Sequence, residues 1–270
     1  MRARVLVDNI SKDFLAAEWG LSLYIEFREH KILLDAGTTD AFLQNAGQMN
    51  IDLAGIDFGV LSHAHYDHAN GIEAFFGAND HAKFYIRGRA RENCYGKKEG
   101  KLRYIGVQKG LQKKYRERFV RAEGDYKIAD GIYLIPHKTK GLETIGARSD
   151  LYVKRGLRMR PDGFEHEHSL VLEEENGLIV LNSCSHAGAD NIIREITETF
   201  PGKKILAIIG GLHLYKLTDD EVRAFAKRVK DTGIEAVYTG HCTGDRPFEV
   251  MKEELGDTVH QFFSGMEIII

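Results

Sequence analysis

The sequence lacks several features that would assign a protein to a specialised class. It has three cysteines in 270 residues, Cys94, Cys184 and Cys242, and an odd, small number gives no framework of disulfide bonds. A reducing, cytoplasmic setting is therefore expected. No apolar run approaches the roughly 20 residues that a membrane helix needs. The first ten residues also lack the hydrophobic region of a signal peptide, so we expect no membrane association.

An excess of charge of one sign is also missing. The chain has 37 Lys and Arg against 40 Asp and Glu, a net charge of −3 at pH 7. Nucleic-acid binders usually have a basic excess, so nucleic acid is not an expected partner. Hydrophobic residues make up 43% and charged residues 29% of the chain, which is typical of a globular protein with one large domain or two small ones.

Strand and helix patterns are mixed along the whole chain, without an internal repeat. Apolar or alternating runs predict strands at residues 4–9, 21–27, 31–35, 57–62, 83–86, 169–173, 177–181, 204–209, 235–239 and 266–270. Amphipathic patterns predict helices that start near residue 41 and that cover residues 71–76, 189–199 and 219–230. Strands in both halves permit two packed sheets with helices outside them.

Periodicity weakens between residues 87 and 161. Residues 97–121 contain ten Lys or Arg and two Glu. This stretch is either a solvated excursion from the main fold or a cap that offers positive charge to an anionic substrate. Arg87, Arg89 and Arg91 alternate after a predicted strand, so they are either ordinary surface residues or side chains that meet one anion.

The strongest functional signal is the run His63-x-His65-x-Asp67-His68, which follows a predicted strand and precedes a predicted helix. Imidazole nitrogen and carboxylate oxygen suit zinc, iron or manganese. His63 and His65 are spaced by two and could hold one ion. Asp67 and His68 lie one step further and could hold a second ion a few Å away, as two-metal sites require.

Three later motifs each place a histidine after an apolar strand. They are Ser-Cys-Ser-His-Ala-Gly at 183–188, Gly-Gly-Leu-His-Leu at 210–214 and Thr-Gly-His-Cys-Thr-Gly at 239–244. Their histidines, His186, His213 and His241, are expected near the strand ends where the first cluster also lies. A single histidine of this kind is usually structural, but three in the same topological place favour a shared site.

Residues 61–71, Leu-Ser-His-Ala-His-Tyr-Asp-His-Ala-Asn-Gly, and residues 33–37, Leu-Leu-Asp-Ala-Gly, resemble the metallo-β-lactamase superfamily. The resemblance implies an α+β fold, a four-layer αββα sandwich that forms a single domain over residues 1–270, with residues 87–161 as a cap-like insertion. It implies two divalent metal ions at the sheet edges, with zinc favoured and iron or manganese as alternatives. His241 matches the last metal histidine of the superfamily, and Asp35 matches an aspartate that orients the metal-binding loop.

Nearly the whole chain is similar to a narrower subgroup, the relatives of archaeal 7,8-dihydropterin-6-methyl-4-(β-D-ribofuranosyl)aminobenzene 5′-phosphate synthase. The shared features include the three histidine motifs and the strand near the N-terminus. One departure from the superfamily pattern is that Asn182-Ser183-Cys184 replaces a Gly-Asp pair. Cys184 is therefore either a thiolate ligand or a small buried residue.

A second departure concerns the third ligand of the first metal. The superfamily has a histidine in a turn before the hairpin, and Glu165 occupies that position here. His166, His168 and His186 are the alternatives.

The resemblance implies a metal-dependent hydrolase that uses a metal-bound hydroxide on a small ester, lactone or phosphate-type substrate. Asp67 would hold the hydroxide or accept its proton, and His213 is the second candidate catalytic residue. One alternative is a transferase that condenses a dihydropterin diphosphate with an arylamine, for which the basic stretch would suit the diphosphate. The other alternative is a non-catalytic protein that binds a metal or ligand.

Overall fold

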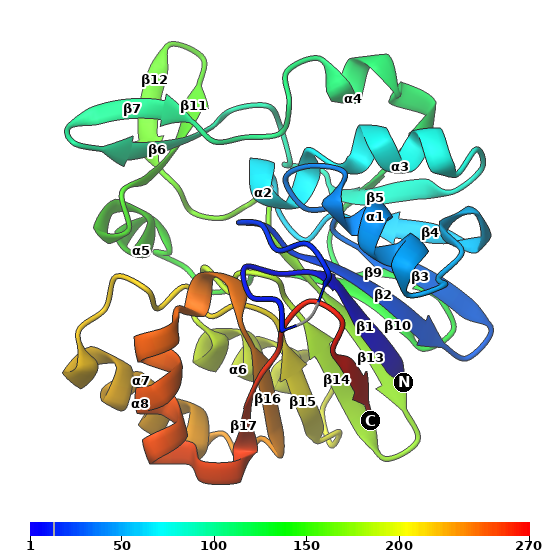
Figure 1. Ribbon diagram of the computed structural model, residues 1–270. Coiled ribbons are helices and arrows are strands. Elements are labelled where there is room, and N and C mark those ends of the chain that lie inside the picture. The colour runs from blue at the N-terminus through cyan, green and yellow to red at the C-terminus, as the bar shows by residue number, and fades with distance from the viewer. Residues whose placement is uncertain (13) are drawn as a thin grey trace.

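Two seven-stranded sheets form the centre of the protein (Figure 1). The structure is a computed structural model, and it describes residues 1–12 and 14–270. The first sheet has the order β18-β1-β2-β3-β4-β5-β8. Its strands are β1 (Arg2–Val7), β2 (Ser22–Phe27), β3 (His30–Leu34), β4 (Phe58–Val60), β5 (Lys83–Arg87), β8 (Phe119–Ala122) and β18 (Glu267–Ile269).

The second sheet has the order β17-β16-β15-β14-β13-β10-β9. Its strands are β9 (Tyr126–Ala129), β10 (Ile132–Pro136), β13 (His168–Glu174), β14 (Gly177–Leu181), β15 (Ile205–Ile209), β16 (Ala236–Thr239) and β17 (Val259–Gln261). The hairpin of β13 and β14 is antiparallel, whereas β14 to β17 run parallel.

The core between the sheets follows the two-residue period of a strand. In β3, Ile32 and Leu34 belong to the layer between the sheets, and Leu33 belongs to the layer under the outer helices. In β14, Ile179 faces inward while Val180 faces outward. Both faces of these strands are covered, which explains why their sequences are continuous apolar runs.

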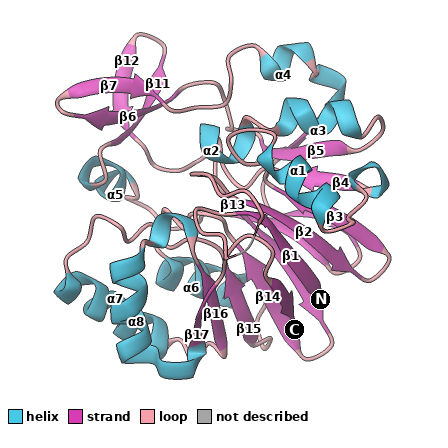
Figure 2. Cartoon of the chain, in the orientation of Figure 1, coloured by secondary structure: helices cyan, strands magenta, loops and turns pink. Residues whose placement is uncertain are grey.

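Helices cover the outer face of each sheet (Figure 2). On the first sheet lie α1 (Ala41–Gln48), α2 (Tyr66–Ala69), α3 (Ile72–Ala78) and α4 (Leu111–Lys114), and on the second lie α6 (Ala189–Thr199), α7 (Asp219–Asp231) and α8 (Asp245–Leu255). Helix α7 begins at a capping box, in which Thr218 and Glu221 satisfy each other's backbone N–H groups. The predicted α+β sandwich of four layers is confirmed.

The stretch 87–161 is not one insertion, contrary to the expectation from its weak periodicity. Strand β8 belongs to the first main sheet, and β9 and β10 belong to the second. The other strands, β6 (Cys94–Lys98), β7 (Lys101–Tyr104), β11 (Leu151–Arg155) and β12 (Arg158–Pro161), form a separate four-stranded sheet that we call the cap. It stands apart from the body beyond α5 (Glu143–Arg148) (Figure 1). The sequence did not reveal this division, because the strands are short and irregular and contain many charged residues.

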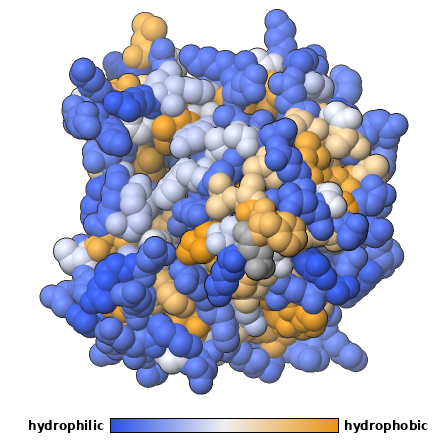
Figure 3. All heavy atoms as spheres, in the orientation of Figure 1, coloured by the Kyte–Doolittle hydropathy of each residue, from blue (hydrophilic) through white to orange (hydrophobic). Residues whose placement is uncertain are grey.

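The parallel strands bring their carboxyl ends to one edge of the sandwich. Strands β3, β4, β5 and β8 are parallel in the first sheet, as β14 to β17 are in the second. Loops at the carboxyl ends of such strands form the usual binding crevice of open sheets. The face seen in Figure 3 is largely hydrophilic, and within residues 1–12 and 14–270 no helix is long and apolar enough to cross a membrane.

Candidate metal centre

The loop after β4 is held by one buried carboxylate, that of Asp35 at the end of β3. Its Oδ1 accepts the backbone N–H of Ser62 at 2.7 Å, and its Oδ2 accepts the Ser62 hydroxyl at 2.6 Å. The Ser62 oxygen is then free to accept from Nδ1 of His63 at 2.8 Å. This chain of bonds leaves the Nε2 lone pair of His63 available to a metal.

His63, His65 and His186 form the first group of potential ligands, because one nitrogen from each lies within 4.8 Å of the others. His186 comes from the loop after β14 and is held from behind. Its ring stacks on Phe164 at 5.0 Å between centroids, and its backbone N–H donates to Oε1 of Glu167 at 3.2 Å. The structure thus brings these three histidines together, although His63 and His186 lie 123 positions apart in the sequence.

Burial keeps these histidines neutral, which is the form that binds a metal. It lowers the pKa of His65 to about 3, and lowers the pKa values of His63 and His186 well below their usual range. Among the described residues, Nε2 of His63 and of His65 and both ring nitrogens of His186 have no hydrogen-bond partner. A buried polar atom without a partner costs free energy, so this donor set fits a cation.

A second group lies beside the first and contains Asp67, His68, Cys184 and His241. Oδ2 of Asp67 lies 3.5 Å from Nε2 of His241 and 3.8 Å from Nε2 of His68. The latter nitrogen is 3.2 Å from Sγ of Cys184. Burial acts to raise the pKa of Asp67, but His68 and His241 together lower it below its usual value.

Cys242 was missed by the sequence reasoning, although it directly follows His241. Its Sγ lies 3.4 Å from Sγ of Cys184, and the two thiols with His241 form a potential ligand group. Burial acts to raise the pKa of the Cys242 thiol, but Cys184 and His213 hold it well below its usual range. The loop after β15 passes very close to Cys242, since a Cβ added at Gly211 would lie 2.5 Å from its sulfur.

His213 lies at the edge of both groups, with its ring 4.4 Å from that of His186. Ser185, His213 and His241 all have φ near +50°, a left-handed conformation that is uncommon for residues other than glycine. Such strain concentrates at functional sites, where the surrounding structure maintains it. The three later motifs are therefore tight turns that aim side chains across the sheet edges.

The other three candidates for the third ligand of the first metal, Glu165, His166 and His168, make different contacts. Glu165 pairs with Arg155 at 2.9 Å and its side chain is half exposed. His168 directs Nε2 to the carbonyl of Leu61 at 2.9 Å. His166 bonds Asp162 at 2.8 Å, but its ring lies 5.2 Å from that of His65. His65, Cys94, Asp162 and His166 form a further potential ligand group. Glu165 and His168 thus have contacts outside the group of His63, His65 and His186, and their role as the third ligand stays a prediction.

A cleft of about 400 Å³ opens above the two groups. Its floor includes His65, Asp67, Cys184, His186, His213 and Cys242, and its walls include Trp19, Tyr66, Tyr215, Lys97, Lys98, Arg103 and Lys216. The cap supplies Lys97, Lys98 and Arg103 to these walls. Arg87 and Arg89 line a different pocket.

The profile of the metallo-beta-lactamase superfamily matches residues 20–193, and the chain belongs to this superfamily. Among solved structures it is similar to Tm1679, described as a metal-dependent hydrolase of the beta-lactamase superfamily, with 30% identity, a TM-score of 0.85, and coverage of 100% of this chain and 99% of the other. A diphosphatase from the PhnP family shares the fold, at 13% identity and a TM-score of 0.57, over 100% of this chain and 97% of that one.

Among curated proteins, the chain is 27% identical to the 7,8-dihydropterin-6-methyl-4-(beta-D-ribofuranosyl)-aminobenzene-5'-phosphate synthase of Methanocaldococcus jannaschii. That match covers 96% of each chain. The superfamily and the subgroup that the sequence motifs predict are confirmed.

Proposed function

We propose that the chain is a metal-dependent hydrolase that acts on a small anionic substrate. His63, His65 and His186 would hold one divalent ion, and Asp67, His68, Cys184 and His241 a second. The observation that carries this proposal is the set of buried ring nitrogens of His63, His65, His186, His213 and His241, which have no partner among residues 1–12 and 14–270. His65, His186 and His213 of this set line one cleft. The sulfur of Cys184 in this donor set, with that of Cys242 3.4 Å away, favours zinc first and iron second.

Two such ions would polarise the substrate and lower the pKa of water between them. The chain's own residues supply the proton handling. Asp67 stays ionised at neutral pH because its pKa is lowered, so its Oδ2 can accept a proton from the nucleophile. His213 lies on the cleft floor and is placed to pass a proton to the leaving group.

The walls of the cleft support an anionic substrate with a flat apolar part. Lys97, Lys98, Arg103 and Lys216 supply positive charge, which attracts phosphate or carboxylate. Trp19 packs edge to face with Tyr215 at 5.7 Å between centroids, and such exposed aromatic faces bind planar groups.

The test uses protein purified without added metal, first assayed for metal content. It is then offered a chromogenic phosphodiester, an aryl ester and a lactone, each alone. We expect about two ions per chain and turnover of the phosphodiester, with KM raised several-fold in Lys97→Gln and Arg103→Gln. Protein that holds its ions but turns over none of the three would overturn the hydrolase and favour a binding protein.

A transferase is the second candidate, and the similarity to the pterin synthase supports it. The same basic walls would hold a diphosphate, and the attacking atom would be an arylamine nitrogen instead of water. Release of pyrophosphate that requires both a pterin diphosphate and an arylamine would favour transfer. Release from the diphosphate alone would favour hydrolysis.

A further inference from the structure

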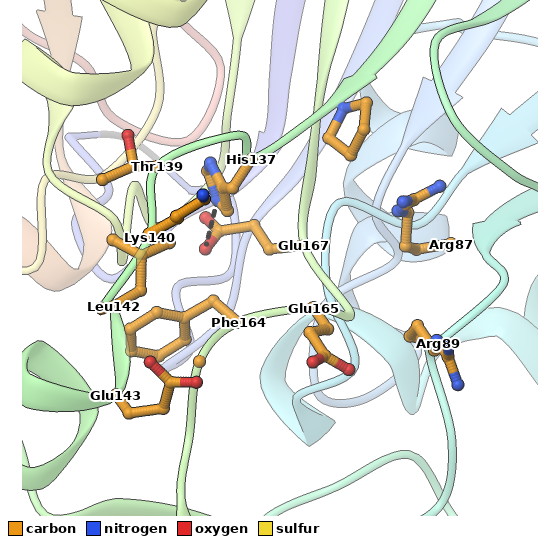
Figure 4. Close-up of a pocket in the computed structure, with 13 residues that line it drawn as sticks. Arg87, Arg89, His137, Thr139, Lys140, Leu142, Glu143, Phe164, Glu165 and Glu167 are labelled. Atoms are coloured by element: carbon orange, nitrogen blue, oxygen red, sulfur yellow. Dashed lines mark ion pairs between the residues drawn. The ribbon is translucent and has the colours of Figure 1, made fainter.

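A second pocket of about 400 Å³ lies on the opposite side of Phe164 and Glu167 from the cleft. Figure 4 shows Arg87 and Arg89 on one side of this pocket, with His137 and Lys140 on the other. Arg87 is the last residue of β5, whereas His137 and Lys140 follow β10. Residues at the edges of both main sheets therefore line this pocket, which lies outside the candidate metal centre. We call it the arginine pocket.

The arginine pocket has unbalanced positive charge. Nη1 of Arg87 donates to the carbonyl of Ala122 at 3.0 Å, and its buried Nε has no partner among the described residues. Arg89 and Lys140 are exposed and form no ion pair within residues 1–12 and 14–270. Cations without partners around a cavity attract an anion.

The carboxylates that line the pocket are mostly neutralised. Glu165 pairs with Arg155 at 2.9 Å. Glu167 is completely buried and lies 3.1 Å from Nε2 of His137, the ion pair drawn in Figure 4. Within residues 1–12 and 14–270, the third lining carboxylate, Glu143, forms no ion pair, so it can oppose the charge of Arg87, Arg89 and Lys140.

A smaller cavity of about 280 Å³ extends the positive surface. It shares Arg89 and Glu165 with the arginine pocket and adds Arg91, Lys154 and Arg155. The alternating arginines of the sequence thus line two adjoining cavities rather than open surface. Guanidinium groups bind oxyanions through two parallel hydrogen bonds, so a ligand with more than one anionic group would suit this arrangement.

We propose that the arginine pocket binds a small, multiply charged oxyanion, such as a phosphate ester or diphosphate, at a site separate from the metal cleft. Its volume falls within the range of small-molecule sites. A ligand there would lie against Phe164 and Glu167, the two residues that hold His186 from behind. A ligand bound at this site would therefore contact Phe164 and Glu167 behind His186 without entering the cleft.

The test is calorimetric titration of the full-length protein, with its bound metal, by pyrophosphate, inorganic phosphate and citrate. The variant is Arg89→Gln combined with Lys140→Gln, since both side chains are exposed and neither is tied into a sheet. We expect binding of pyrophosphate at one site, weakened at least roughly tenfold in the double variant. Citrate binding as tight as that of pyrophosphate would identify a polycarboxylate, and weaker citrate binding a phosphate compound.

Two controls separate this site from the cleft. Arg116→Gln removes an exposed cation that lines neither pocket and should leave the affinity unchanged. Trp19 is the single tryptophan and lines the cleft, so its emission reports an anion in the cleft and should not follow the arginine-pocket event. The proposal is overturned if the double variant binds as tightly as wild type, or if no binding occurs at millimolar pyrophosphate. It is also overturned if Lys97→Gln abolishes the event. None of these outcomes depends on turnover at the metal centre.

Discussion

Nδ1 of His68 lies 2.8 Å from Oδ2 of Asp35, and both side chains are completely inaccessible to solvent. The same carboxylate oxygen also accepts the hydroxyl of Ser62, which in turn contacts Nδ1 of His63. One buried aspartate therefore fixes the ring orientation of a histidine in each of the two proposed ligand groups. Partners of this kind orient metal ligands and raise their basicity.

Asp35→Asn should weaken metal binding roughly 10- to 100-fold, because the amide no longer accepts from both His68 and Ser62. Asn also tolerates the left-handed φ of 59° at this position, so folding should survive. Competition with a chelator measures the affinity. The matched control is Asp57→Asn, which alters an exposed carboxylate that accepts the N–H of Lys31. Equal affinities in the two variants would show that Asp35 does not act on the metal site.

Exchange of His186 should distinguish the observed ligand geometry from the superfamily pattern. His186→Gln should lower the metal content by about one ion per chain. Glu165→Gln should leave the content unchanged, because Glu165 pairs with Arg155 at the surface. Metal analysis of both purified variants measures this. The opposite result, with metal lost only in Glu165→Gln, would place the third ligand in the turn before β13.

The two close thiols predict that sulfur takes part in metal binding. Cys184→Ser should lower the metal content of the second group, and Cys242→Ser should do so to a smaller extent. Cobalt substitution offers an independent readout, since thiolate-to-cobalt charge transfer should weaken in each variant. Cys94→Ser tests the third thiol separately, because Cys94 lies with His65, Asp162 and His166 in another potential ligand group. An unchanged spectrum in both Cys184→Ser and Cys242→Ser would remove sulfur from the ligand set.

His137 lies between two buried carboxylates, those of Glu167 and Glu195, each 3.1 Å from a ring nitrogen. Burial acts to lower the pKa of His137, but these carboxylates raise it from 6.5 to about 9. A raised pKa means that the stabilisation is complete below about pH 6.5 and disappears as the pH rises through about 9. His137→Gln should therefore lower the free energy of unfolding by about 3 kcal/mol at mildly acidic pH.

Denaturant unfolding over this pH range measures the effect. The wild type should lose stability as the pH rises through about 9, and His137→Gln should lack that loss. His81→Gln is the control, because His81 is an exposed histidine beside Asp80 and should behave like the wild type. Parallel pH profiles for wild type and His137→Gln would mean that His137 is uncharged in the folded protein.

The sandwich and half of the candidate metal centre follow from local sequence patterns. Strand β14 and helix α6 have the predicted bounds because an apolar run and an amphipathic period each define them locally. His63, His65, Asp67 and His68 are close in space because they are close in sequence. The sequence also predicts that the later histidines meet this cluster, since parallel strands end at one edge.

The remaining features depend on tertiary structure that no local pattern encodes. Glu165 occupies the expected ligand position in sequence, yet its turn directs it towards Arg155. Cys242 looks like an ordinary buried residue until the loop after β14 brings Cys184 against it. The cap was not separated from its surroundings because β6 and β11 pair with each other across about fifty intervening residues.

The cap also bears on how this protein could diversify. Its sheet supplies Lys97, Lys98 and Arg103 to the walls of the cleft, whereas the body supplies the histidines of the floor. Under the proposed function, part of the positive charge that would attract a substrate therefore lies on a different sheet from the proposed metal ligands. If the proposed function holds, exchange of the β6–β7 hairpin should change which anion the cleft prefers and leave the proposed metal ligands in place.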